Sequence, residues 1–248
     1  SGCVEVVAAL DGRVTNGGVA RYGDLEGRHL DAISPRTFGP EIIALHVETR
    51  QSNIYVAQAA RTRVFRDDEP VEVARSLYQM EDYIQQVVGF DVAQGEPVRV
   101  EKLASLYTSR DRAINEPLTN AGKSCGRYPN FEEALERHKR AWDELWRSAD
   151  VYMPGNAHVQ QLLRLHVSHI LQVCSPHTTN HDAGVPARGL NGEAYRGHVF
   201  WDELYVFRYL TSRLPEITRE LIMYRYRRLG EARAPPPQAG DPRAKLPR

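Results

Sequence analysis

Hydrophobic and polar residues alternate along the first half of the chain with a period of two. The stretch EIIALHVET places Ile43, Leu45 and Val47 on one side of an extended chain, which predicts a half-buried strand. Further strands are predicted over VEVVAAL, SNIYVAQAA, DYIQQVVGFDV and PVRVEKLASLYTS, separated by Gly, Pro and Asp signals. Because no helical pattern separates these strands, they predict an antiparallel β-sandwich rather than a parallel sheet.

The period changes near Pro129. Asn130 and Glu133 predict a capping box, and apolar residues of 131–146 then recur at helical spacing. Further helices are predicted over 157–173, after Trp201, and from Pro215 to about residue 229. The pattern therefore predicts a β-domain followed by an all-α region.

Four segments follow from this change of pattern. Residues 1–128 are predicted as a β-sandwich, 129–150 as a helical linker, and 151–230 as a helical domain. The segment 231–248 contains three consecutive prolines and few large apolar residues, so we expect it to be disordered. The chain enters on a strand pattern without an initiator Met, and we expect the sandwich to be truncated at its N-terminus.

Composition narrows the class of protein. The 248 residues are 42% hydrophobic and 26% charged, as in a soluble globular protein. Thirty-two basic residues balance 32 acidic ones, which gives no general attraction to nucleic acid or to an anionic membrane. No apolar run is long enough for a membrane span. Three widely spaced cysteines argue against a disulfide framework, so we expect a cytoplasmic protein.

Two short motifs are poor candidates for catalysis. AGKSCG at 121–126 contains Gly-Lys-Ser, but a phosphate-binding loop needs a glycine where Pro117 stands. Cys174 lies near His177, as nucleophilic catalysis would require, yet no third orienting group is identifiable. We interpret Cys174 as a small residue that closes a helix.

A histidine cluster raises the question of a metal site. His166 and His169 are three apart on a predicted helix, and His177, His181 and Asp182 follow in the next loop. A metal needs ligands that converge on one point, and nothing in this spacing requires convergence. We therefore expect no metal.

The stretch YRGHVFWDEL at 195–204 is the strongest candidate. An indole such as Trp201 offers a flat apolar face to sugar C–H groups, and a carboxylate such as Asp202 accepts hydrogen bonds from adjacent hydroxyls. Arg196 and His198 add donors. The alternative is an ordinary helix start, in which the acids satisfy the helix dipole and Trp201 packs. The residues alone favour neither.

The surrounding residues carry a resemblance. SPHTTNHDAGVPARGLNGEAYRGHVFWDELYVFRYL (175–210) resembles the start of the catalytic domain of glycoside hydrolase family 65. LDGRVTNGGVARYGDLEGRHL, EKLASLYTSRD and FEEALERHKRAWDELW resemble the same family, so the similarity spans roughly residues 4–230. The family includes maltose, trehalose and kojibiose phosphorylases and trehalose hydrolases. Its fold implies an N-terminal β-sandwich, a helical linker and an (α/α)6 barrel, of which this chain holds the first helices.

The resemblance also implies site residues. Trp201 and Asp202 are expected in the subsite for the glucose whose bond is broken, with Trp201 as a wall and Asp202 binding hydroxyls. Arg196 and His198 belong to the same motif and are expected to line that site. The family's general-acid Glu lies downstream of the motif, so no catalytic residue is expected in this chain.

The implied reaction inverts the anomeric centre of an α-glucobiose such as trehalose or maltose. In phosphorylases, inorganic phosphate is the co-substrate and attacks directly, whereas a hydrolase needs a second carboxylate about 6.5–9.5 Å from the acid. The resemblance leaves both reactions open, implies no other cofactor, and allows a homodimer of the full-length parent. We expect the chain by itself to be inactive.

Two other classes stay open. One is a non-catalytic carbohydrate-binding or interaction module, in which residues 1–128 bind glycans, although no exposed aromatic platform is evident in the strand patterns. The other is a non-functional gene remnant, whose incomplete barrel would expose apolar helix faces and aggregate.

Overall fold

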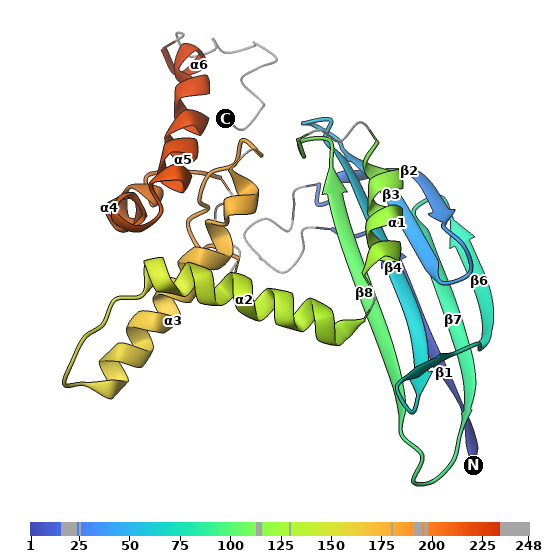
Figure 1. Ribbon diagram of the computed structural model, residues 1–248. Coiled ribbons are helices and arrows are strands. Elements are labelled where there is room, and N and C mark those ends of the chain that lie inside the picture. Colours follow the sequence, from blue (N-terminus) through green and yellow to red (C-terminus); the bar gives the residue numbers. More distant parts are fainter. Residues whose placement is uncertain are drawn as a thin grey trace. The chain divides into compact units, whose positions relative to one another are not determined.

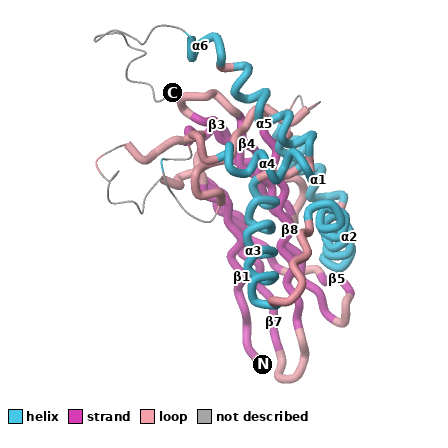
Figure 2. The backbone as a smooth tube through the Cα atoms, turned by 90° about the vertical axis from the view of Figure 1, so that its left-hand side faces the viewer, coloured by secondary structure: helices cyan, strands magenta, loops and turns pink. Residues whose placement is uncertain are grey.

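The computed structural model describes residues 1–15, 24, 26–112, 116–128, 130–179, 181–190, 195 and 198–233. The chain divides into two compact units, Ser1–Asp143 and Glu144–Arg248. The described strands belong to the first unit, and most of the helices belong to the second (Figures 1 and 2). The order of elements confirms the predicted class, antiparallel sheets followed by helices.

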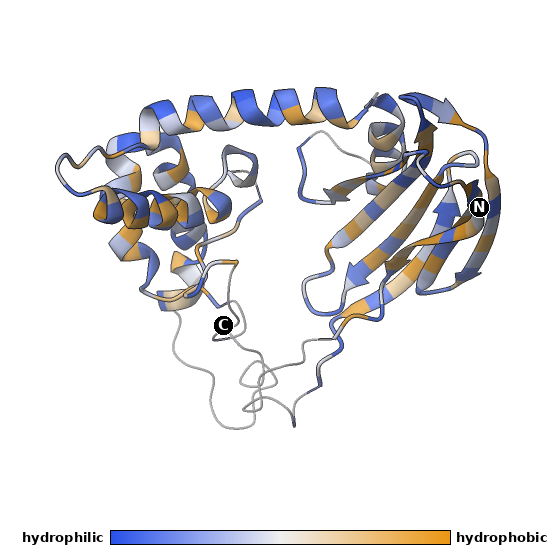
Figure 3. Cartoon of the chain, turned by 90° about the horizontal axis from the view of Figure 1, so that it is seen from below, coloured by the Kyte–Doolittle hydropathy of each residue, from blue (hydrophilic) through white to orange (hydrophobic). Residues whose placement is uncertain are grey.

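The first unit contains two antiparallel sheets. The smaller has the order β1-β7-β6, and the larger has the order β2-β3-β4-β5 with β8 also paired to β4. Their bounds are β1 Gly2–Asp11, β2 Leu30–Thr37, β3 Ile42–Thr49, β4 Tyr55–Arg66, β5 Glu69–Val71, β6 Ala74–Met80, β7 Tyr83–Val92 and β8 Val98–Thr108. The five strands predicted from alternation are β1, β3, β4, β7 and β8, and Figure 3 shows the alternation along the strands.

The larger sheet is covered on both faces. On one face a core of Leu10, Ile43, Leu45, Val47, Ala60 and Ile84 includes residues of both sheets. On the other face lies helix α1, Pro117–Arg127 (Figure 1). Ala44, Ala57 and Ala59 of the sheet meet Ala121 of the helix, and these small side chains allow a close approach.

Helix α1 was not expected, because the first half of the chain has no long helical pattern. Gly122, Lys123 and Ser124 lie in its interior. Backbone N–H groups inside a helix are already bonded to carbonyl oxygens four residues earlier, so they are not available to cradle a phosphate. This placement agrees with rejecting the Gly-Lys-Ser motif as a phosphate-binding loop.

The remaining helices are α2 Phe131–Ala149, α3 Ala157–Val173, the 3-10 turn η2 Pro176–Thr178, α4 Glu203–Arg213, α5 Pro215–Arg227 and α6 Leu229–Arg233. Among them, α2 to α5 follow the predicted pattern, whereas η2 and α6 were not predicted, and α6 extends into the segment 231–248 that was expected to be disordered. At the start of α2, Asn130 accepts from the Glu133 amide at 3.0 Å, but the Glu133 carboxylate pairs with Arg137 instead of completing the box. The rest of the proline-rich segment, 234–248, lies outside the described residues. Among the described helices, none is long and apolar enough to cross a membrane.

Candidate functional site

Trp201 stands at the surface immediately before α4. Its side chain is 67% exposed, and its ring meets that of Tyr205 edge-on at a centroid distance of 6.1 Å. Tyr205 lies one turn further along the helix and is 73% exposed. Tryptophan is highly buried on average in folded proteins, so a solvent-facing indole beside a second aromatic ring is a candidate for a binding surface.

Asp202 precedes the first residue of α4 but does not cap the helix with its side chain. Its backbone is helical, with φ −57° and ψ −36°, and its carboxylate makes no capping hydrogen bond. A capping aspartate normally has an extended backbone and accepts from an amide two or three residues on. The Asp202 carboxylate is therefore not used by the helix, unlike in the ordinary helix start considered above.

His198 has local partners. Its Nδ1 lies 2.6 Å from the carbonyl oxygen of Tyr195, and its ring stacks on Phe200 at 6.0 Å. Tyr195 has a left-handed backbone, φ 53°, which is unfavourable for a bulky residue. Its ring meets Phe200 edge-on at 5.3 Å, a contact that offsets part of this cost. Arg196, the fourth predicted site residue, lies outside the described residues.

Glu203, the second acid of the motif, is fully buried. One carboxylate oxygen accepts from Arg225 of α5, and the other accepts from the amide of Val185 at 3.2 Å. Neither Arg225 nor Val185 was predicted from the sequence as a partner of Glu203. Arg225 is one of several arginines in MYRYRR, and Val185 lies in an irregular segment, so no periodicity distinguished them.

Cys174 is the C-cap of α3, and its amide donates to the Ile170 carbonyl, which confirms its interpretation as a helix-closing residue. Burial and the negative charge of Glu203 raise the pKa of its thiol to about 12. The thiol therefore stays protonated at neutral pH and is a poor nucleophile.

Asp182, the carboxylate considered as a metal ligand, forms salt bridges with two arginines. It pairs with Arg227 at 2.9 Å and with Arg228 at 3.0 Å. The hydrogen bond from Arg228 is the largest cause that lowers the pKa of Asp182, and the bond from Arg227 lowers it further. The two pairs tie the segment before α4 to the end of α5. In the part of the chain that the structure describes, no three His, Cys, Asp or Glu side chains are grouped to hold a metal.

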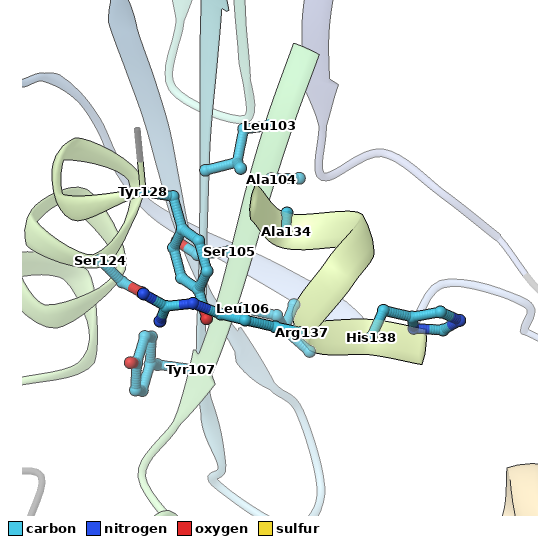
Figure 4. A pocket seen from close by; sticks show the side chains of 10 residues that line it. All are labelled: Leu103, Ala104, Ser105, Leu106, Tyr107, Ser124, Tyr128, Ala134, Arg137 and His138. Atoms are coloured by element: carbon cyan, nitrogen blue, oxygen red, sulfur yellow. The ribbon is translucent and has the colours of Figure 1, made fainter. Parts of the chain in front are cut away.

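The first unit contains a separate cleft of about 500 Å³. Its floor is the strand segment Leu103–Tyr107, and its walls come from the end of α1 and the start of α2. Arg137 reaches across toward Tyr128 and Ser124, whereas His138 points away (Figure 4). The guanidinium lies 5.6 Å from the centroid of the Tyr128 ring.

Hydrogen bonds from Arg61 fix the backbone at Tyr128, in the wall of the cleft. Arg61 is buried in the sheet, and its guanidinium donates to the Tyr128 carbonyl at 2.5 Å and to the Gly126 carbonyl at 3.4 Å. Ser105 donates to the Ala121 carbonyl at 2.6 Å, which fixes α1 on β8. The cleft therefore combines an aromatic ring, hydroxyl groups and a guanidinium on a supported frame.

The chain belongs to glycosyl hydrolase family 65. The profile of the family's N-terminal domain matches residues 1–145, and that of its central catalytic domain matches residues 164–247. These matches confirm the family that the motif at 175–210 resembles.

Proteins similar to this chain in sequence and in structure are much longer than it is. It is 40% identical over 240 residues to an uncharacterized glycosyl hydrolase of Mycobacterium tuberculosis, which covers 97% of this chain and 18% of that protein. It is 31% identical to the alpha,alpha-trehalose phosphorylase of Thermoanaerobacter brockii, over 100% of this chain and 32% of that protein. A solved structure described as a candidate kojibiose phosphorylase from the human microbiome has the same fold, with a TM-score of 0.69 and 20% identity, over 93% of this chain and 29% of that one.

Proposed function

We propose that Trp201 and Asp202 bind a glucose unit of an α-glucobiose, within a protein that cleaves the disaccharide by phosphorolysis or hydrolysis. The observation that carries the proposal is an exposed indole next to a carboxylate that its own helix does not use. Relatives named trehalose phosphorylase and kojibiose phosphorylase support this substrate class. Their names also support inorganic phosphate as a co-substrate.

The chemistry follows from the two side chains. The indole face packs against sugar C–H groups, which removes apolar surface from water without demanding hydrogen bonds. The carboxylate accepts hydrogen bonds from two adjacent hydroxyls, and bonds to a charged acceptor are stronger than neutral ones. Arg196 and His198 are proposed to line the same subsite.

We expect residues 1–248 to bind glucose but not to cleave a disaccharide. A general acid must reach the glycosidic oxygen, and Glu203 is buried with both oxygens engaged, so it does not qualify. The family resemblance assigns the acid to a later part of the catalytic domain. We therefore expect glucose binding without cleavage of trehalose, kojibiose or maltose.

Calorimetric titration of the chain with glucose and with each disaccharide tests the site. Asp202→Asn keeps the shape but removes the charge, and a hydrogen bond to a charged group contributes about 1.5–3 kcal/mol. This predicts about ten- to a hundredfold weaker binding, at 1.4 kcal/mol for each factor of ten. Trp201→Ala should weaken binding as well. Tyr152→Ala is the control, because Tyr152 is another largely exposed aromatic residue of the same unit but lies outside the motif.

Equal affinity in wild type and Asp202→Asn would remove the subsite assignment. Release of glucose or glucose 1-phosphate from any of the three disaccharides would contradict the expectation that the chain lacks turnover. The assay is run with and without phosphate, because glucose 1-phosphate forms only by phosphorolysis, whereas glucose is released in both reactions.

A second function, carbohydrate binding without catalysis, is favoured by the cleft in the first unit. Tyr128 is 36% exposed, and the hydroxyls of Tyr107 and Ser124 and the Arg137 guanidinium also line the cleft. This combination suits the alternating apolar and hydroxyl faces of a neutral glucan. No such platform was evident in the strand patterns, because Tyr128 follows a helix.

One titration with maltotriose distinguishes the two functions. Binding in the cleft predicts that Tyr128→Ala and Arg137→Met weaken affinity about tenfold while Asp202→Asn has no effect. Tyr78→Ala, an exposed strand tyrosine outside the cleft, is the control. Maltotriose affinity that is unchanged in both cleft variants would exclude this second function.

A further inference from the structure

The residue after Asp202 is a carboxylate without any solvent contact. Glu203 is 0% exposed, although it is the first residue of α4, where glutamate usually faces water. Taking an ionised carboxylate out of water is strongly unfavourable unless both of its oxygens are hydrogen-bonded and its charge is paired. The contacts of Glu203 therefore indicate what the fold gains from burying it.

These contacts surround the proposed sugar-binding pair. Arg225 of α5 donates from its Nε to a carboxylate oxygen of Glu203 and from its Nη2 to the carbonyl of Phe200. Phe200 directly precedes Trp201, and Glu203 directly follows Asp202. One guanidinium thus binds the backbone carbonyl of the residue before the pair and the side-chain carboxylate of the residue after it.

The other carboxylate oxygen fixes a second segment. It accepts from the Val185 amide at 3.2 Å. The neighbouring Gly184 has no room for a side chain, because a Cβ there would lie 2.7 Å from the Val199 methyl groups and 3.2 Å from the carboxylate of Glu203. The segment before α4 therefore packs directly against the turn that carries Trp201 and Asp202.

We infer that Glu203 is a positioning residue: with Arg225 it sets the directions in which Trp201 and Asp202 project toward the sugar. This inference rests on the proposed glucose subsite. Glu203 acts through the backbone and does not touch the sugar, because its carboxylate is buried. An interaction held in place before binding loses less entropy when the ligand arrives, so the expected consequence is tighter binding.

The test uses the whole chain with Trp142 and Trp146 replaced by phenylalanine, so that Trp201 is the single tryptophan and can be excited where the tyrosines absorb little. Glu203→Gln keeps an acceptor for the Val185 amide but leaves Arg225 without a counter-charge. We expect about tenfold weaker glucose binding and a changed susceptibility of Trp201 to acrylamide quenching, at a temperature where circular dichroism shows a folded chain. The double variant Glu203→Gln with Arg225→Gln removes the unpaired charge but also the bonds of Arg225 to Glu203 and Phe200, so the changes in glucose binding and quenching should persist. Recovery of both signals would mean that the single variant acts through an unpaired charge and would overturn the positioning role.

Two further variants test the positioning role independently of Glu203→Gln. Arg225→Lys retains the charge but cannot donate to both Glu203 and Phe200 in the same way, so it should change the Trp201 signal even if Glu203→Gln does not fold. Glu220→Gln is the control, because Glu220 is an acid of the same helix that pairs with Arg219 and Arg227 rather than with Arg225. It should leave the quenching of Trp201 unchanged.

Different results would overturn the positioning role of Glu203 and the glucose subsite. Quenching and glucose affinity at wild-type values in Glu203→Gln and Arg225→Lys would overturn the positioning role. Loss of the Asp202→Asn effect on glucose binding would overturn the subsite, whatever the Trp201 signal does. A changed Trp201 signal in Glu220→Gln would show that the readout follows general stability, and this too would overturn the positioning role.

Discussion

At the residue scale, Gly122 gives α1 the space to approach the sheet. A Cβ at this position would lie 2.5 Å from ring carbons of Phe38, whereas at Gly126 in the same helix the nearest atom is Ile42 Cδ1 at 4.0 Å. Gly122→Ala should destabilise the chain by about 1–3 kcal/mol, because overpacking outweighs the gain in helix propensity. Gly126→Ala, the matched control, should stabilise it by up to about 1 kcal/mol. Urea unfolding followed by circular dichroism measures both, and equal effects would contradict the close approach.

The site residues differ in whether the neighbouring residues of the sequence are enough to predict them. Trp201 and Asp202 could be named from the sequence, because the chemistry of a sugar site and the family motif both lie in adjacent residues. Glu203 could not, because an acid at a helix start is ordinarily solvated. Its burial depends on Arg225, 22 residues further on, and only the packing of α4 against α5 brings the two together.

At the element scale, sequence patterns succeed where one face of an element is continuously apolar. The bounds of α3 agree with the predicted 157–173, since its apolar residues recur through every turn. Helix α1 was missed because PLTNAGKSCGR contains two glycines and several weak helix formers. It is stabilised from outside: Glu116 caps its start, Arg61 binds carbonyls at its end, and Leu118, Ala121 and Cys125 pack on the sheet.

Three strands were missed for related reasons. Strand β2 contains Pro35, which argues against a central strand, but β2 is at the edge of its sheet and tolerates a missing amide donor. Strand β5 has three residues, too few for a period to be read. Strand β6, ARSLYQM, is mostly exposed, so its burial does not produce an alternating pattern. Alternation reports burial on one face, and these strands have little of it.

At the scale of the whole molecule, the helices of the second unit leave large apolar side chains in water. Each of α3, α4 and α5 contributes two that are more than one-third exposed: Leu162, Leu165, Leu204, Tyr205, Ile222 and Tyr226. Monomeric soluble proteins rarely expose large contiguous apolar patches. The chain spans 18–32% of the length of the relatives compared above.

These exposed faces make a measurable prediction. Purified 1–248 should bind the dye anilinonaphthalene sulfonate while its circular dichroism is that of a folded chain, because this dye reports accessible apolar surface. Leu165→Lys and Ile222→Lys should each lower the dye fluorescence without loss of helix signal. Val7→Lys on β1 is the control: Val7 is 58% exposed, but it lies in the first unit, so its replacement should change dye binding less. Dye fluorescence no higher than that of a compact monomer of similar size would mean that the faces of α3 and α5 are covered in solution, by a second copy or by the chain itself. Sedimentation velocity distinguishes these two, since only the second copy raises the mass.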